Sequence, residues 1–370
     1  MKITFYVFLS VASIGTAYFA WAYNKVAKQE KVVGEFSHFV EQSNIDTSIQ
    51  VLLGQYSTNT QIAVAIINNK ETNYYGYIKK EVGVEKVINQ NSIFEIGSIT
   101  KTFTSSLAAV CYKKGLLQPT TTLKEVLSFK MPDDVSAITL LQLSNHTSGL
   151  ARLPENMKMP DPTNPYADYD TTQLFGFLKR AKLESASGTK YSYSNLGAAL
   201  LGVICSNTLN MSYEKALQQY ILVPLQMNQT TTNLTEVQKQ FLVKGLDVEG
   251  NETSNWDFDC MAGAGAIKST VANMVLYAKA NLDTTNMLYN SCHKESFKVN
   301  AQMSLGMGWH IIHDKSGEEI LFHNGGTGGY TSCLMLNVKK QKAVIVLTNI
   351  SAFNSKMGLI DALCAKLLKK

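Results

Sequence analysis

A serine and a lysine three residues apart have the types and spacing for nucleophilic catalysis: Ser98 and Lys101, in Gly-Ser-Ile-Thr-Lys. If the following residues are helical, Lys101 lies one turn further along the same face, within reach of the Ser98 hydroxyl. A serine hydroxyl is a weak nucleophile until a base removes its proton. An amine in a dry pocket can act as that base, because burial lowers the pKa of a lysine. The pair therefore indicates attack on a carbonyl and a covalent acyl-enzyme.

The Ser-x-x-Lys spacing is a weak signal by itself, and this sequence contains it four times, starting at Ser98, Ser187, Ser212 and Ser291. Ser187 lies in a Ser-Gly-Thr turn, Ser212 has the setting of a helix N-cap, and Ser291 lies in a polar loop. Ser98 instead stands between a strand-like apolar segment and an amphipathic helix, whose N-terminus stabilises developing negative charge. We therefore expect Ser98 to be the nucleophile. For this motif in isolation, the alternative is an N-cap serine beside a surface lysine.

Two polar segments further along the chain could complete such a site. Residues 191–195 (Tyr-Ser-Tyr-Ser-Asn) precede a helix of small residues, and residues 323–326 (His-Asn-Gly-Gly) lie between two expected strands. Taken singly, Tyr193 could be an interface aromatic, Asn195 a helix N-cap and His323 a buried strand histidine. Only their occurrence together with Ser98 favours a catalytic interpretation.

The three motifs, in this order, resemble the class C β-lactamase and penicillin-binding-protein superfamily of serine hydrolases (the β-lactamase-related family). Three intervening segments are similar to landmarks of that family: residues 146–150 (His-Thr-Ser-Gly-Leu), residues 262–265 before Ser269-Thr270, and residues 306–309 (Gly-Met-Gly-Trp). The resemblance implies that Tyr193 lies over the Ser98 hydroxyl and relays its proton to the leaving group, as a phenol or phenolate coupled to Lys101. His146 is expected to be structural.

The resemblance also implies how a substrate is held. Asn195 would hydrogen-bond Lys101 and the substrate amide. The backbone N–H groups of Ser98 and Gly326 would form the oxyanion hole. His323 and Gly325 would contact the substrate.

One departure from the β-lactamase pattern bears on the substrate. His323-Asn324-Gly325 stands where a class C β-lactamase has Lys-Thr-Gly. A histidine is mostly neutral at pH 7, so the anchor for a penicillin carboxylate is weakened. We therefore expect a hydrolase of D-Ala-type peptides (a carboxypeptidase or peptidase). A carboxylesterase or weak β-lactamase is the alternative among enzymes, and an acylatable or inactive protein that binds cell-wall fragments is the alternative of another class.

The expected elements place strands at both ends of the chain and helices in the middle. Residues 61–68 and 72–78 are expected to be two strands separated by a polar turn at 69–71. A helix is expected from residue 99 to Gly115, and a final helix at 354–368. This pattern predicts an α/β (α+β) fold. By resemblance it is the β-lactamase/transpeptidase-like fold, an antiparallel sheet flanked by N- and C-terminal helices with an inserted all-helical domain. The predicted sheet domain comprises residues 46–97 and 256–370, and the helical domain residues 98–255.

The N-terminus has the composition of an export signal. Residues 3–22 carry no charge and end in Ala-Trp-Ala, so we expect a signal peptide or membrane anchor at 1–22, followed by a linker at 23–45. The protein is then exported, periplasmic or extracellular, with membrane attachment through residues 3–22 as one outcome. Its partners would be a small peptide, ester or β-lactam substrate, or peptidoglycan.

Composition excludes other classes of function. The net charge of +5 is spread along the chain without a dense basic block, which argues against a nucleic-acid partner. Six cysteines and six histidines show no metal-ligand spacing, so we expect neither a metal nor an organic cofactor. Cys260 and Cys292 could pair in an oxidising compartment. The absence of Gly-x-Ser-x-Gly argues against an α/β-hydrolase.

Overall fold

The computed structural model describes residues 16–370. The leader predicted at residues 1–22 lies mostly outside this range, and its last residues form the start of helix α1 (Thr16–Gln42). Within residues 16–370, no helix combines the length and apolar content that a membrane crossing requires.

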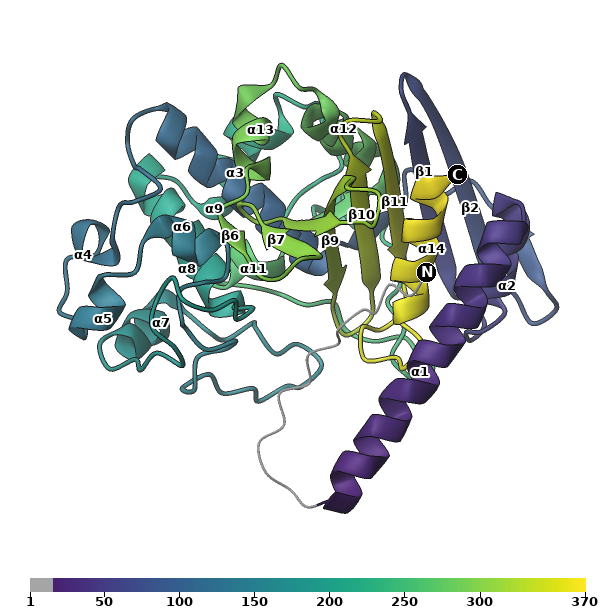
Figure 1. Ribbon diagram of the computed structural model, residues 1–370, viewed down its shortest axis with the longest axis horizontal. Helices are drawn as coiled ribbons and strands as arrows, with labels where there is room; N and C mark the ends of the chain where they lie inside the picture. Colours follow the sequence, from purple (N-terminus) through teal and green to yellow (C-terminus); the bar gives the residue numbers. More distant parts are fainter. Residues whose placement is uncertain (1–15) are drawn as a thin grey trace.

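A nine-stranded antiparallel sheet occupies one half of the molecule (Figure 1), with the strand order β3-β2-β1-β11-β10-β9-β8-β7-β6. Strands from the two ends of the chain meet in its centre, where β1 pairs with β11 and Ile62 lies opposite Thr348. The strands are β1 (Gln61–Asn68), β2 (Glu71–Lys79), β3 (Val84–Lys86), β6 (Phe297–Lys298), β7 (Met303–Leu305), β8 (His310–His313), β9 (Glu319–Gly326), β10 (Thr331–Asn337) and β11 (Lys342–Thr348). A separate two-stranded sheet pairs β4 (Ile93–Glu95) with β5 (Lys268–Thr270).

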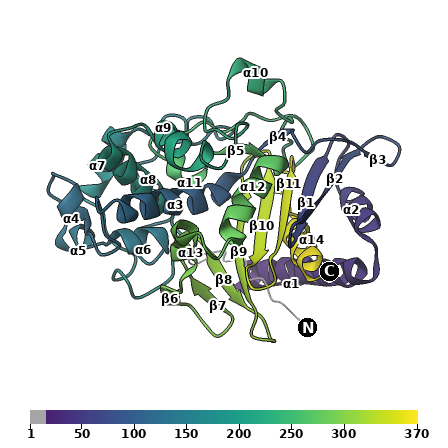
Figure 2. The same ribbon diagram turned by 90° about the horizontal axis from the view of Figure 1, so that it is seen from above.

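Helices cover both faces of the large sheet. Successive side chains of a strand point to opposite faces. Accordingly, Ala63 and Ala65 of β1 pack in one hydrophobic cluster with α12 (Val271–Leu282), and Ile62 and Val64 pack in another with α14 (Gly358–Lys369). Figure 2 shows α12 on one side of the sheet and α14 with α1 on the other. The central strands are buried on both sides for this reason, as the unbroken apolar run of β11 requires.

The middle of the chain is helical, as the sequence predicted. Residues 98–255 contain no strand of either sheet. Their core is built around α3 and α8, which pack against each other and are buried along most of their length. Gly115 follows the end of α3 with φ at +70°, the left-handed conformation that commonly ends a helix.

Helix α2 packs against β2 and α14, and helices α3–α10 lie in the helical middle of the chain. Of the later helices, α11 packs against α8, α12 against β11 and α13 against α3. The bounds of these helices are α2 (Ile45–Leu53), α3 (Thr100–Lys113), α4 (Leu123–Val126), α5 (Asp133–Ser136), α6 (Leu140–Ser144), α7 (Thr171–Leu178), α8 (Asn195–Leu209), α9 (Tyr213–Leu217), α10 (Glu236–Lys239), α11 (Ala262–Gly265) and α13 (Met287–His293). A 3-10 turn, η1 (Gly97–Ile99), precedes α3, and a π-helical turn, η2 (Gln218–Leu222), follows α9.

The expectation of a linker at residues 23–45 is wrong. Most of this segment belongs to α1, which packs against α14. Phe36 and Val40, four residues apart on one helical face, are buried in the same cluster as Leu363 and Leu367 of α14. Burial of this apolar stripe holds the helix on the sheet domain.

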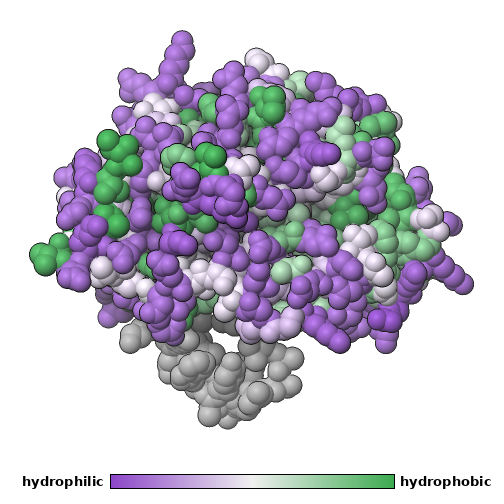
Figure 3. Space-filling model, turned by 180° about the vertical axis from the view of Figure 1, so that it is seen from behind, coloured by the Kyte–Doolittle hydropathy of each residue, from purple (hydrophilic) through white to green (hydrophobic). Residues whose placement is uncertain are grey.

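The surface offers no single extended apolar face in the view of Figure 3. Hydrophilic side chains predominate there, and hydrophobic ones form small separate groups. Such scattered exposure is normal for a folded domain.

Candidate active site

Ser98 lies where a buried strand ends and the central helix begins. Strand β4 leads into η1, and α3 starts two residues after Ser98. Lys101, in the first turn of α3, has a side chain only 2% exposed. Its Nζ lies 3.0 Å from Ser98 Oγ and 2.7 Å from the carbonyl oxygen of Ala264. The structure therefore brings the two residues into direct hydrogen-bond contact.

The surroundings of Lys101 favour the neutral form of its amine. Burial lowers the pKa of its amine well below the usual value, and the nearby positive charge of Arg152 lowers it further. No carboxylate of the described chain lies within ion-pair distance to offset these effects. A neutral amine presents a lone pair, so Nζ can accept the Ser98 proton while it donates to Ala264.

Tyr193 lies next to this pair. Lys101 Nζ is 4.9 Å from the centre of the Tyr193 ring. Desolvation raises the pKa of the Tyr193 phenol to about 12, although a hydrogen bond with the Ser98 hydroxyl and the charge of Arg152 act in the opposite direction. A phenol with this pKa keeps its proton at neutral pH. Of the two forms that the resemblance left open, the geometry and electrostatics favour the phenol.

His146 holds the segment that carries Tyr193. Its backbone carbonyl accepts a hydrogen bond from Ser192 N at 2.8 Å, and its ring Nδ1 accepts one from Ser194 N at 3.2 Å. The ring lies 4.4 Å from that of Tyr193, centre to centre. His146 adopts φ of +59°, which places both its carbonyl and its ring against the same segment. The expected structural role thus has a specific form, the positioning of residues 192–194.

Asn195 has a different partner from the one expected. Its Nδ2 donates to the Tyr166 hydroxyl at 3.2 Å, and its Oδ1 is buried without a hydrogen bond. Within residues 16–370 no hydrogen bond joins Asn195 to Lys101, whose amine is already held by Ser98 and Ala264. The N-cap of α8 is the preceding residue, Ser194, which accepts from Gly197 N at 2.9 Å.

His323 is a neutral imidazole close to the phenol. Its side chain is 1% exposed, and the two ring centres of His323 and Tyr193 are 6.4 Å apart. Desolvation, together with the fields of His310 and Lys101, lowers the pKa of His323 well below the usual value. Its Nδ1 lies 2.6 Å from the Asn324 carbonyl oxygen. Because a carbonyl only accepts, we assign the ring proton to Nδ1, so that Nε2 carries an unpartnered lone pair.

Glycines allow the predicted oxyanion donors to meet. Gly97 has φ of +49°, and a Cβ there would lie 2.5 Å from the backbone nitrogen of Gly326. A Cβ on Gly325 would lie 2.0 Å from the Ile96 carbonyl oxygen and 2.8 Å from Ser98 N. The end of β9 and the turn before α3 therefore approach so closely that only glycine fits, and the amides of Ser98 and Gly326 become neighbours.

Several residues around this cluster were missed by the sequence analysis. Arg152 lies with its Cζ 5.1 Å from the Tyr193 ring centre. Tyr191 shares a hydrogen bond of 2.9 Å with His310 Nε2. An aromatic group borders Asn195, in which Tyr166 stacks on Phe258 with 4.8 Å between ring centres. The position of Arg152, two residues after the segment 146–150, was the one available signal.

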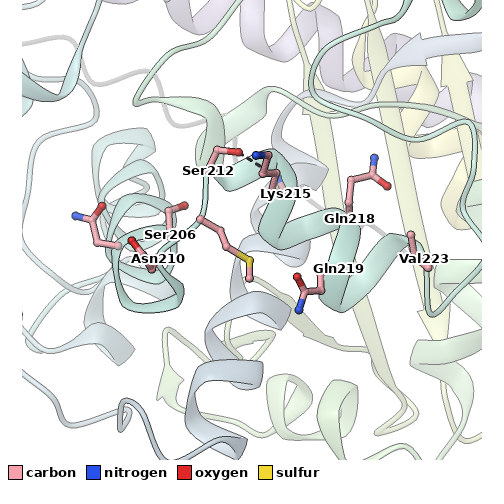
Figure 4. A pocket seen from close by; sticks show the side chains of 9 residues that line it. Ser206, Asn210, Ser212, Lys215, Gln218, Gln219 and Val223 are labelled. Atoms are coloured by element: carbon pink, nitrogen blue, oxygen red, sulfur yellow. Dashed lines mark hydrogen bonds between the residues drawn. The ribbon is translucent and has the colours of Figure 1, made fainter.

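Two of the other Ser-x-x-Lys serines, Ser212 and Ser291, have local structural roles. Ser212 is the N-cap of α9, and its hydroxyl accepts from the backbone nitrogen of Lys215 at 3.3 Å, as the dashed line of Figure 4 shows. Both residues line an open surface groove of about 710 Å³ between the ends of α8 and α9. The Ser291 hydroxyl donates to the Leu288 carbonyl at 2.7 Å. Neither serine is paired with a buried amine.

The cysteines are free and buried, and Cys260 and Cys292 are not joined in a disulfide. The Sγ atoms of these two residues contact the backbone carbonyls of Tyr169 and Ser105, respectively. In the part of the chain that the structure describes, no group of histidine, cysteine and acidic side chains is arranged to hold a metal ion.

An antiparallel sheet with an inserted helical region, and a serine held by a buried lysine between them, define a serine hydrolase of the β-lactamase and D-Ala carboxypeptidase type. The family model described as Beta-lactamase matches residues 51–366. The chain belongs to this family.

Several relatives share about a quarter of their aligned residues with this chain. A β-lactamase of Pseudomonas fluorescens is 25% identical over 273 residues, which cover 72% of this chain and 73% of that protein. A β-lactamase of Providencia stuartii is 24% identical over 66% of this chain, and the match spans only 60% of its own length. Protein flp of Staphylococcus aureus is 25% identical over 84% of this chain and 64% of its own length.

Solved structures share the fold. A β-lactamase/D-alanine carboxypeptidase from Pseudomonas syringae superposes with a TM-score of 0.75 at 20% identity, covering 88% of this chain and 97% of its own. A class C β-lactamase gives a TM-score of 0.75 at 22% identity, covering 88% of this chain and 95% of its own. These likenesses confirm the predicted β-lactamase/transpeptidase-like architecture.

Proposed function

We propose that the protein hydrolyses an amide or ester carbonyl through an acyl-enzyme on Ser98, and that its substrate is a D-Ala-type peptide. The observation that carries the chemistry is the 3.0 Å contact between the Ser98 hydroxyl and the buried amine of Lys101. A buried, uncharged lysine has few structural uses, and a hydroxyl within its reach is the arrangement that general-base activation needs.

The reaction follows from the positions of the groups. Lys101 takes the Ser98 proton as Oγ attacks the carbonyl carbon. The oxyanion of the tetrahedral intermediate lies between the adjacent amides of Ser98 and Gly326. Tyr193, still protonated, gives its proton to the leaving group as the C–N or C–O bond breaks, and it recovers a proton from Lys101. Water then hydrolyses the Ser98 ester, with the same groups acting in reverse.

The neutral state of His323 argues against strong β-lactamase activity, because the lysine of the β-lactamase pattern is missing. A buried imidazole with a lowered pKa gives no positive charge where a β-lactamase has the lysine of Lys-Thr-Gly. A penicillin would therefore lack a cation at this position. Two of the solved structures with this fold are described as β-lactamase/D-alanine carboxypeptidases, from Pseudomonas syringae and Yersinia pestis. We accordingly rank peptidase activity first, and carboxylesterase or weak β-lactamase activity second.

The substrate class is tested by comparing three reactions of the purified protein. A D-Ala-D-Ala peptide, a short p-nitrophenyl ester and a chromogenic cephalosporin separate the three activities by kcat/KM. We expect the peptide to give the highest value. A cephalosporin turned over faster than the peptide would instead make the protein a β-lactamase.

The nucleophile is tested by intact-mass spectrometry with a fluorophosphonate probe and with a penicillin. We expect an adduct on the wild type and on Ser212→Ala, a variant of the second Ser-x-x-Lys motif, but none on Ser98→Ala. A lasting penicillin adduct with no turnover of any substrate would favour an acylatable protein that senses cell-wall fragments. No adduct with either probe would contradict the acyl-enzyme proposal.

We also propose that the chain is exported and acts on peptidoglycan-derived peptides outside the cytoplasm. The support is the uncharged run at residues 3–22 with its Ala-Trp-Ala end. Fractionation of cells that express the full chain tests this proposal, and recovery in the cytoplasmic fraction alone would contradict it.

A further inference from the structure

Arg152 is an exposed cation of the site that the mechanism above does not use. Its guanidinium carbon lies 5.1 Å from the centre of the Tyr193 ring, and Lys101 Nζ is 4.9 Å from the same centre. The backbone of Arg152 is fixed, because its carbonyl accepts from Asn195 N at 3.0 Å and from Leu196 N at 3.3 Å. The start of α8 thus holds the charge beside the phenol and the predicted substrate-binding amide.

The guanidinium has no acidic partner of its own. Among residues 16–370, no carboxylate lies within 4.0 Å of Arg152, and no hydrogen bond involves its side chain. The protein otherwise uses lysine almost exclusively, since only two of its 34 basic residues, Arg152 and Arg180, are arginines. A guanidinium differs from an ammonium in offering a planar fork of donors that matches the two oxygens of a carboxylate.

On the other side of the site, the residue that stands at the position of the β-lactamase lysine, His323, gives no positive charge for an anion. His323 is neutral, and the free Nε2 lone pair accepts a hydrogen bond instead of donating one. Apart from Lys101, which is itself neutral, Arg152 is the cation whose charge reaches the reacting groups, as its effects on Lys101, Tyr193 and Tyr166 show.

We propose that Arg152 binds a carboxylate carried by the substrate and makes the enzyme selective for anionic substrates. This inference rests on the proposed function and adds a specificity-determining residue to it. The guanidinium would form charge-assisted hydrogen bonds with both carboxylate oxygens, and the substrate would then lie over the Tyr193 phenol and Ser98. The carboxylate belongs either to the acyl part or to the leaving group, and the experiment separates these two sources.

Two matched pairs of esters supply the probes. For the acyl part, p-nitrophenyl hexanoate is compared with mono-p-nitrophenyl adipate, which has the same chain length and a terminal carboxylate. For the leaving group, 3-carbamoylphenyl hexanoate is compared with 3-carboxyphenyl hexanoate. In the wild type, we expect kcat/KM for the anionic ester to exceed that for the neutral one by about tenfold or more in one of the two pairs.

The variants are Arg152→Gln and Arg152→Glu, with Arg180→Gln as the control because Arg180 is the other arginine and is also exposed. We expect the anionic-to-neutral ratio to fall to about one in Arg152→Gln and below one in Arg152→Glu, and to be unchanged in Arg180→Gln. Arg152→Gln should also move the acidic limb of the pH–rate profile to higher pH, because the removed charge lowers the pKa of Lys101. A purely structural role would move neither quantity.

Failure of the inference differs from failure of the proposed function. The role of Arg152 is overturned if the anionic-to-neutral ratio of kcat/KM is near one for both pairs in the wild type, or if a high ratio persists in Arg152→Gln. In either case, hydrolysis of the neutral esters still supports the proposed function. If no ester is hydrolysed, the proposed function fails, and Arg152 is then tested by binding. The affinities of 3-carboxyphenylboronic acid and 3-carbamoylphenylboronic acid are compared by calorimetry, and equal affinities for the wild type contradict the inference.

Discussion

At the scale of single residues, the site depends on two proton affinities that burial shifts in opposite directions. Burial lowers the pKa of the Lys101 amine, which favours its neutral form, and raises the pKa of the Tyr193 phenol to about 12, so that the phenol keeps its proton. The favoured state of the pair is therefore a neutral amine beside a neutral phenol. The phenol proton of Tyr193 is the one that the leaving group will need. A charged lysine beside a phenolate would hold the same number of protons, but it would require two charges in a desolvated site.

The pH dependence of catalysis follows from these shifts. Lys101 must be neutral to act as the base, so kcat/KM rises with pH through the lowered pKa of its amine and then stays level. The alkaline limb, set by loss of the Tyr193 proton, lies near pH 12, above the usual assay range. We expect a plateau across neutral pH for the wild type. An acidic limb at the ordinary lysine pKa would show that the amine is charged in solution.

Lys101→Met should remove the base while preserving the apolar stem of the side chain. We expect kcat/KM to fall by about 10²–10⁴-fold, the usual contribution of a general base. Circular dichroism and the melting temperature of the same preparation report whether the variant is folded. A folded variant with near wild-type kcat/KM would exclude Lys101 from the mechanism.

Tyr193→Phe removes one hydroxyl and leaves the ring against His146. We expect acylation to slow by about 10²-fold or more, because the leaving group then departs without a proton. Single-turnover cleavage of a D-Ala-D-Ala peptide measures this step, because its amine leaving group needs a proton, whereas p-nitrophenolate leaves an ester unprotonated. Tyr191→Phe is the matched control, since it removes the neighbouring phenol that binds His310, and it should retain most of the activity.

At the scale of elements, the site is assembled by three chain segments that end or begin at one place. Helix α3 supplies Lys101, the segment before α8 supplies Tyr193, and the end of β9 supplies Gly325 and Gly326. The β9 end touches the turn before α3 with no space for a side chain. The Ser332 hydroxyl adds to this junction by donating to the Ile96 carbonyl at 2.8 Å.

Gly325→Ala should force the two segments apart. The new Cβ would lie 2.0 Å from the Ile96 carbonyl oxygen, so we expect a loss of about 1–3 kcal/mol of unfolding free energy, as overpacking produces, together with a large loss of activity. Gly176→Ala, in α7 where nothing lies within 4 Å, should be neutral or slightly stabilising. Chemical denaturation of both variants measures the difference, and equal stabilities would contradict the close approach.

At the scale of the whole molecule, the face of the sheet behind the site contains a buried acid. Asp361 of α14 accepts a hydrogen bond from Asn324 Nδ2 at 2.7 Å, and Asn324 is the residue between His323 and Gly325. Desolvation raises the pKa of Asp361 to about 7, against an ordinary value of 3.8. The folded protein therefore binds this proton more tightly than the unfolded chain does.

This raised pKa makes global stability depend on pH. Between about pH 4 and 7 the folded state holds the Asp361 proton and the unfolded state has lost it, so this residue lowers the unfolding free energy as the pH rises. Asp361→Asn stays neutral throughout. We expect it to be increasingly more stable than the wild type from pH 4 to 7, with a constant difference above pH 7. A difference that is independent of pH would contradict a buried, protonated Asp361.

Much of the fold and part of the site could be predicted from the sequence, for identifiable reasons. The bounds of β1 could be predicted because residues 61–68 form a short apolar run that ends at the polar turn 69–71, as expected for a strand buried on both faces. Ser98 and Lys101 are close in sequence, so helix geometry alone placed them together. The irregular segment 151–170 positions Arg152 and Tyr166, the partner of Asn195. Tertiary packing sets the path of this segment, and its sequence has no hydrophobic periodicity from which the path could be predicted.

The pairing of β1 with β11 has a consequence for how the chain acquires its fold. β1 is among the first strands to leave the ribosome and β11 is the last, so the hydrophobic face of β1 stays without its partner until synthesis is nearly complete. Removal of the final strand and α14 would deprive the earliest strand of its neighbour and expose an aggregation-prone edge. A truncation that removes residues 342–348 would therefore leave β1 without its neighbour on this side.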